Sequence, residues 1–226
     1  MLNETEIESS KPLYGVAPAE EIRASVRKDG YLPIAFPLLL WGRVVDGTPY
    51  RDEWRFGWSA ARRLDAAHIQ FERVREALDR APIANRLNGP VLHDVIGDAE
   101  MGIWALDKAI EIASCLSGRF GVEVPFPALV ADKRPLIASL RDHYSHIEER
   151  VLGKVKQKID DRAEEAFEYE ALVLCRELTD GHDTLGIDAE ATILCKTLRT
   201  YLYEAWRDLT RREGREDVAR LARVPT

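Results

Sequence analysis

The chain has 226 residues, of which 46% are apolar and 31% are charged, and its net charge is −7. This length allows one domain with a proper core, with or without appendages, and the composition is that of an ordinary globular protein. The acidic balance argues against a general nucleic-acid coat but leaves room for a local basic cleft. Three widely spaced cysteines form no metal-binding pattern or disulfide framework, which fits a reducing cytoplasm.

Neither the first residues nor the longest apolar run predicts a contact with a membrane. The polar, acidic start MLNETEIESSKP does not resemble a secretory signal. The longest apolar run, from Tyr31 to Val45, is interrupted by prolines and an arginine and is too short to span a bilayer. We therefore expect a cytoplasmic protein.

The N-terminal part is predicted to be irregular. Residues 1–18 are expected to form a flexible tail, and residues 19–57 a short helix followed by an arm. In the arm, the segments Trp41–Val45 and Tyr50–Phe56 could pair as a β-hairpin around Asp46-Gly47. A wrapped, irregular arm fits these residues equally well.

Long helices dominate the rest of the chain, over about 58–81, 92–117, 132–152 and 188–212. Three of them carry apolar residues in steps of three and four, which is the pattern of helices that pack in a bundle. The repeating residues are Ala61, Leu64, His68, Phe71, Val74 and Leu78; Ile96, Ala99, Ile103, Leu106, Ile110 and Ala113; and Leu194, Leu198, Tyr201, Ala205 and Leu209. The sequence thus predicts a mainly α fold, with a helical-bundle domain over residues 58–212.

Glycines, prolines and polar residues predict where these helices end. Gly118 is expected to close the second helix, and the crossover loop 118–131 to follow it. Asp132 is then a candidate N-cap, with Pro135 in the first turn of the third helix and Gly153 at its end.

Between the third and fourth helices the pattern changes. A small β-hairpin is predicted from residues 169–178 and 183–187, joined by a turn at Thr179–Asp183. A helix through residues 163–178 is the alternative. Residues 213–226 are expected to form a basic C-terminal tail.

One short motif in the third helix combines residues that suit phosphate chemistry. Arg141 is followed directly by the polar residue Asp142, and four residues separate Arg141 from His146. An arginine keeps its charge and can hold a phosphate, and a histidine titrates near neutral pH and can transfer a proton. The pairs Arg63–His68, Arg86–His93 and Arg176–His182 have permitted spacings too, but only Arg141 is followed by Asn, Asp or His.

The motif resembles the signature of the HEPN family, whose domains are helical bundles with the motif on a late helix. The resemblance covers about residues 58–212 and implies a metal-independent endoribonuclease without a cofactor. It also implies that the active cleft is composed from two protomers, and that the protein is a toxin or defence effector held by a neutralising partner protein.

The helical phase separates the two histidines of this region. His143 falls on the apolar stripe with Leu140 and Ile147, which favours a core histidine, whereas His146 lies off it. Asp142 stands four residues before His146, where it could orient the imidazole ring. A metal site made from His143, His146 and Glu149 is disfavoured, because steps of three residues swing the side chains apart, and we predict no metal.

Arg141 and His146 do not share a face of an ideal helix, because five residues turn it by about 140°. A twofold dimer in which Arg141 of one chain meets His146 of its partner would remove this difficulty. From Lys133 to Lys158 there are seven cations and three anions, and we expect Arg150 and Lys154 to help bind the RNA substrate. A surface salt bridge of Arg141, in an inactive helical bundle that only dimerises or binds a partner protein, is the alternative.

Overall fold

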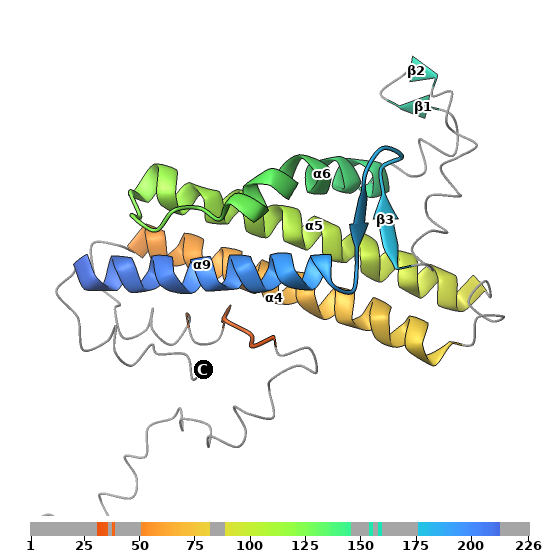
Figure 1. The fold of residues 1–226 in the computed structure, drawn as a ribbon, viewed down its shortest axis with the longest axis horizontal. Coiled ribbons are helices and arrows are strands. Elements are labelled where there is room, and N and C mark those ends of the chain that lie inside the picture. Colours follow the sequence, from red (N-terminus) through yellow and green to blue (C-terminus); the bar gives the residue numbers. More distant parts are fainter. Residues whose placement is uncertain are drawn as a thin grey trace, which may run out of the picture. The chain divides into compact units, whose positions relative to one another are not determined.

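The computed structural model describes residues 31–35, 38, 51–81, 89–145, 154–155, 158–159 and 176–212. The described residues form the helices α4 (Arg51–Arg80), α5 (Gly89–Phe120), α6 (Ala128–Ser145) and α9 (Glu190–Arg212), accompanied by short antiparallel strand pairs (Figure 1). The predicted fold class, a mainly α helical bundle, is confirmed. The chain divides into two units, residues 1–33 and 34–226, and all of these elements belong to the second.

The core lies where α4, α5 and α9 meet. The longest contact runs between α4 and α5, while α9 packs on both and α6 packs on α5 and α9. Every apolar position predicted for α4 and α9 is buried, and so are those of α5 except the partly exposed Ile96. The spacing of apolar residues therefore identified the faces that form the core. Among the described helices, none is both long enough and apolar enough to cross a bilayer.

The first bundle helix begins earlier than predicted. Residues 51–56 are helical, so the β-hairpin proposed for the arm is wrong for the strand Tyr50–Phe56. Asp52 and Glu53 supply acidic side chains to the first turn, where they favour the positive end of the helix dipole. Trp54 stacks on Trp58 with ring centroids 6.2 Å apart, a contact that requires the one-turn spacing of a helix.

The second helix ends later than predicted. Gly118 lies inside α5, and the helix stops only at Phe120, before Gly121 with a φ of 63° that suits glycine. Phe120 packs edge to face against Phe56 of α4 at 5.2 Å. This tertiary contact stabilises the final turn, which the glycine alone would weaken.

The third helix begins four residues before the predicted N-cap. The carbonyl oxygen of Pro127 accepts hydrogen bonds from Val130 and Ala131, so the helix starts at Ala128 and Asp132 is not its N-cap. Pro135 consequently lies inside α6 and not in its first turn. The predicted end at Gly153 lies outside the described residues.

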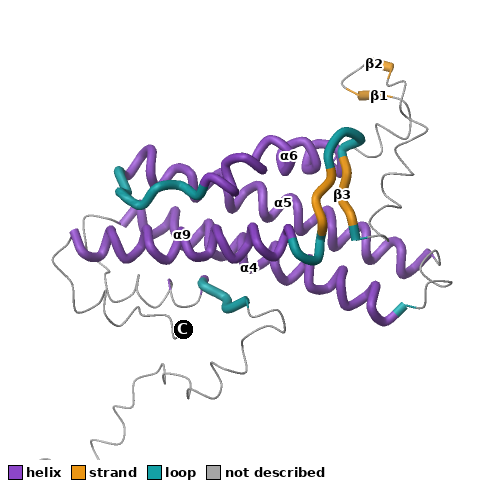
Figure 2. The backbone as a smooth tube through the Cα atoms, in the orientation of Figure 1, coloured by secondary structure: helices purple, strands orange, loops and turns teal. Residues whose placement is uncertain are grey.

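The predicted hairpin before the last helix is confirmed, but its strands are shorter than predicted, since Arg176 precedes the first strand with a φ of 65° and Thr179 belongs to that strand and not to the turn. Strand β3 (Glu177–Thr179) pairs with β4 (Thr184–Gly186) in an antiparallel register that sets Leu178 opposite Leu185 (Figure 2). A helix continuing through residue 178 is therefore wrong. A second, unpredicted pair joins β1 (Lys154–Val155) to β2 (Lys158–Ile159).

Several predictions fall on residues that the structure does not describe. They are the tail 1–18, the short helix of the 19–57 segment, the first strand of the proposed arm hairpin and the basic tail 213–226.

Candidate functional site

The first two residues of the HEPN-like motif lie on α6, where it packs against α5. The Arg141 guanidinium donates from Nη1 to Oδ2 of Asp107 on α5 at 2.7 Å. It also donates from Nη2 and Nε to Oδ1 of Asp142, at 2.6 and 3.0 Å. Two carboxylates thus hold Arg141: that of Asp107 on the neighbouring helix α5, and that of Asp142 on α6 itself.

Burial differs among the three partners. The side chain of Asp107 is 7% exposed, that of Arg141 27% and that of Asp142 54%. A buried carboxylate is costly without a charged partner, so Asp107 needs Arg141 more than Asp142 does. Asp107 therefore anchors the guanidinium, while Asp142 occupies its solvent-facing side.

The electrostatic surroundings keep Arg141 charged. Its hydrogen bonds to Asp142 and then to Asp107 raise the pKa of the guanidinium above its usual value, against the opposing effect of burial. Close by on α5, Lys108 donates to Glu111 at 2.6 Å, and this bond foremost lowers the pKa of Glu111. Carboxylates thus offset the cations here, so the described part of the site has mixed charge.

The pairing leaves Arg141 some capacity for a ligand. A guanidinium has five N–H donors in a planar fork, of which the three bonds above use three, so two remain. The edge of the guanidinium formed by Nε and Nη2 is occupied by Asp142, so a phosphate binds this edge in bidentate geometry only by displacing Asp142.

The other predicted site residues are only partly placed. Asp142 accepts from Arg141, whereas the sequence predicted it to orient His146. His146 and Arg150 lie outside the described residues, and Lys154 is placed only by its backbone in β1. The structure thus brings Arg141 and Asp142 together but does not describe the rest of the predicted set.

His143 lies in the core, as its helical phase predicted. It is 2% exposed, and its ring meets that of the buried Tyr144 edge to face at 5.3 Å. His68 of α4 is equally buried, at 1% exposure. Both histidines therefore belong to the packing of the bundle.

His143→Ala is expected to lower the free energy of unfolding by about 1–3 kcal/mol, because it removes a buried ring from packing. His146→Ala is the matched variant, and we expect it to leave the melting temperature almost unchanged. Thermal unfolding of both proteins, followed by circular dichroism, measures the difference. If His146→Ala were the more destabilised protein, the helical phase assigned to this region would be wrong.

Asp107 is the site residue that the sequence reasoning missed. It lies between the apolar positions Ile103 and Ile110 of α5, next to Leu106, and is buried. An acidic residue within an apolar helical pattern signals a buried carboxylate that needs a partner. The second buried carboxylate of the described chain, Asp65, accepts backbone N–H bonds from Ile34 and Ala35 and serves the fold.

Fold and site together define this protein as a helical bundle with a carboxylate-anchored arginine at an interhelical seam. Comparisons with protein-family models, with curated proteins and with solved structures find no match to the chain.

Proposed function

We propose that the protein is a metal-independent endoribonuclease of HEPN type that acts as a homodimer. One observation carries the proposal: Arg141, the first residue of the motif, is anchored by buried Asp107 of α5 and retains two unused N–H donors. Anchoring by a neighbouring helix pre-organises a guanidinium for phosphate binding. In the cell the enzyme would be a cytoplasmic toxin or defence effector, restrained by a neutralising partner protein.

In the proposed reaction, His146 takes the proton from a ribose 2′-hydroxyl, whose oxygen attacks the adjacent phosphorus. The bond from phosphorus to the 5′-oxygen breaks, that oxygen receives a proton from the imidazolium, and a 2′,3′-cyclic phosphate remains. Arg141 binds the phosphate and stabilises the charge that develops on it. Arg150 and Lys154 bind neighbouring phosphates.

Asp142 has two tasks in this mechanism. In the free protein it occupies the outer side of Arg141. When a phosphate replaces it, the released carboxylate orients the imidazole of His146. Because Arg141 and His146 are about 140° apart on one helix, the two residues of each active cleft come from different protomers.

A specific observation favours a second candidate, a catalytically inactive bundle that dimerises or binds a partner protein. Asp107 and Asp142 together carry more negative charge than Arg141 can neutralise. An arginine paired in this way can serve simply as a link between α5 and α6.

Cleavage of a synthetic RNA and of the DNA of the same sequence, in excess EDTA, tests the proposal. We expect the RNA to be cut and the DNA to remain intact, since only RNA has the internal nucleophile. The rate should follow a bell-shaped or sigmoid pH curve with an inflection near the ordinary histidine pKa of about 6.5. The product should carry a 2′,3′-cyclic phosphate, detectable by mass spectrometry.

His146→Ala, purified in parallel, controls for contaminating nucleases. Cleavage that needs a divalent metal ion, or that persists in His146→Ala, would falsify this mechanism. A wild-type dimer that leaves RNA intact would favour the second candidate.

A further inference from the structure

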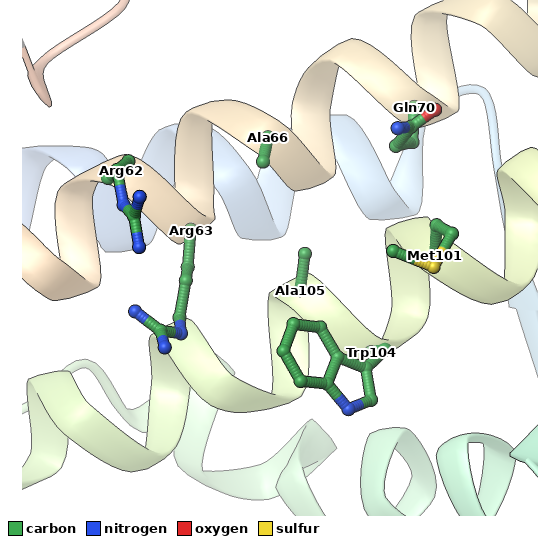
Figure 3. A pocket seen from close by; sticks show the side chains of 7 residues that line it. All are labelled: Arg62, Arg63, Ala66, Gln70, Met101, Trp104 and Ala105. Atoms are coloured by element: carbon green, nitrogen blue, oxygen red, sulfur yellow. The ribbon is translucent and has the colours of Figure 1, made fainter.

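A pocket of about 250 Å³ opens between α4 and α5. Figure 3 shows Arg62, Arg63, Ala66 and Gln70 on α4, and Met101, Trp104 and Ala105 on α5. The small side chains of Ala66 and Ala105 leave room between the helices, and the longer ones surround that room. A volume below that of drug-sized pockets suits a single ring system better than a folded segment of a protein.

Two arginines at this pocket have no carboxylate partner. Arg62 lies over the ring of Trp58 at 5.5 Å, and Arg63 donates from Nη1 to Oγ of Ser59 at 2.7 Å. Neither forms an ion pair within the part of the chain that the structure describes. By contrast, Arg55, Arg73 and Arg80 of the same helix pair with Asp52, Asp98 and Glu76, respectively. Among the described residues, therefore, no carboxylate pairs with the two positive charges of the pocket.

The opposite wall of the pocket exposes two large apolar side chains. Trp104 is 40% exposed and Met101 is 51% exposed, although both belong to a helix whose other face forms the core. A partly exposed indole that lines the same pocket as two guanidinium groups is suited to a planar ring that carries negative charge nearby. Gln70 adds an amide that can donate to and accept from the edge of such a ring.

The pocket also lies close to the candidate site along α5. Trp104 precedes Asp107, the anchor of Arg141, by three residues, which corresponds to a rise of about 4.5 Å and a rotation of about 60°. Because Arg141 contacts Asp107, the pocket residue Trp104 and the contact point of the motif arginine lie within one turn of each other along α5.

We propose that this pocket binds one base of a single-stranded RNA, stacked on Trp104, while Arg62 and Arg63 bind the phosphates beside it. The inference rests on the proposed ribonuclease function, which it extends by a substrate-binding subsite outside the motif. Stacking on an aromatic ring accepts any base, so this subsite contributes affinity for unpaired strands and little sequence preference. Trp104, Arg62 and Arg63 position the substrate and take no part in proton transfer.

A fluorescently labelled 2′-O-methyl oligonucleotide is the probe, because it lacks the free 2′-hydroxyl and cannot be cleaved. We would measure its Kd by fluorescence anisotropy at several salt concentrations. Trp104→Ala is expected to raise the Kd by at least about fivefold without changing the salt dependence. The double variant Arg62→Ala/Arg63→Ala is expected to raise the Kd and to reduce the slope of log K against log salt by about 1.4.

The double variant Arg55→Ala/Arg80→Ala is the matched control, since both arginines lie on α4 away from the pocket lining and pair with Asp52 at 3.5 Å and Glu76 at 3.3 Å. We expect its affinity and salt slope to equal those of the wild type, and melting curves to show that every variant is folded. Equal losses in Arg55→Ala/Arg80→Ala and in Arg62→Ala/Arg63→Ala would reduce the effect to general electrostatics and overturn the proposal. Unchanged binding in Trp104→Ala would also overturn the proposal. Absence of oligonucleotide binding would do the same, including the case in which an acidic peptide binds at Trp104 instead.

Binding and cleavage are measured separately, so the two proposals can fail independently. Binding that depends on Trp104 without RNA cleavage would retain the subsite and reject the nuclease. Cleavage that depends on Arg141 and His146, with affinity independent of Trp104, would retain the nuclease and reject the subsite.

Discussion

Arg141→Ala is expected to lower the rate of RNA cleavage by about 10²–10³-fold, because it removes the donors proposed to stabilise the charged transition state. The same change should lower the free energy of unfolding by about 1–3 kcal/mol. It leaves the buried carboxylate of Asp107 without the Nη1 donor that lies 2.7 Å from it. The single substitution Arg141→Ala therefore cannot tell a loss of catalytic activity from a loss of folded protein.

The double variant Asp107→Asn/Arg141→Ala separates the two effects. Asparagine keeps the shape of the side chain but removes the buried charge, so we expect stability to return toward that of the wild type. Activity should remain lost, because the guanidinium is still missing. We would measure the free energy of unfolding and the cleavage rate for the wild type, both single variants and the double variant. These four proteins form a double-mutant cycle. Recovery of cleavage in the double variant would show that Arg141 acts only through the fold.

Gly102→Ala is expected to cost about 1–3 kcal/mol of stability by overpacking the contact between α4 and α5. A Cβ at this position would lie 2.8 to 3.2 Å from three ring atoms of Phe71, which is too close for a rigid, buried aromatic ring. Chemical denaturation of the purified variant measures this cost.

Gly97→Ala is the matched control in the same helix, because a Cβ there would meet nothing within 4 Å. Alanine favours a helix more than glycine does, by about 1 kcal/mol, so this variant should be as stable as the wild type or more so. Comparable destabilisation of both variants would contradict the close approach of Phe71 to α5. A second change, Phe71→Leu, should relieve part of the strain in Gly102→Ala.

The part of the candidate site that the sequence could predict was the local part. Arg141 and Asp142 are neighbours in the chain, and the phase of His143 followed from the apolar positions around it. The partner of Arg141 could not be predicted in the same way, because Asp107 lies 34 residues away on another helix. The pocket at Trp104 likewise depends on two helices whose relative placement no spacing within either one determines.

By itself, the sequence determined which residues face the core and where the hairpin before the last helix lies. The core faces follow from apolar residues spaced three and four apart, and these faces are buried as expected in α4 and α9. The hairpin follows from the turn residues between its two strands. The first turn of α4 and the last turn of α5 depend on tertiary structure, whereas Gly121 stops α5 and the Pro127 carbonyl starts α6 through local hydrogen bonds. Phe56 meets Phe120 only when α4 and α5 are packed, and that contact extends both helices past the predicted ends. The same packing sets Arg141 against Asp107, because a buried charge selects its partner by proximity in space and not by distance along the chain.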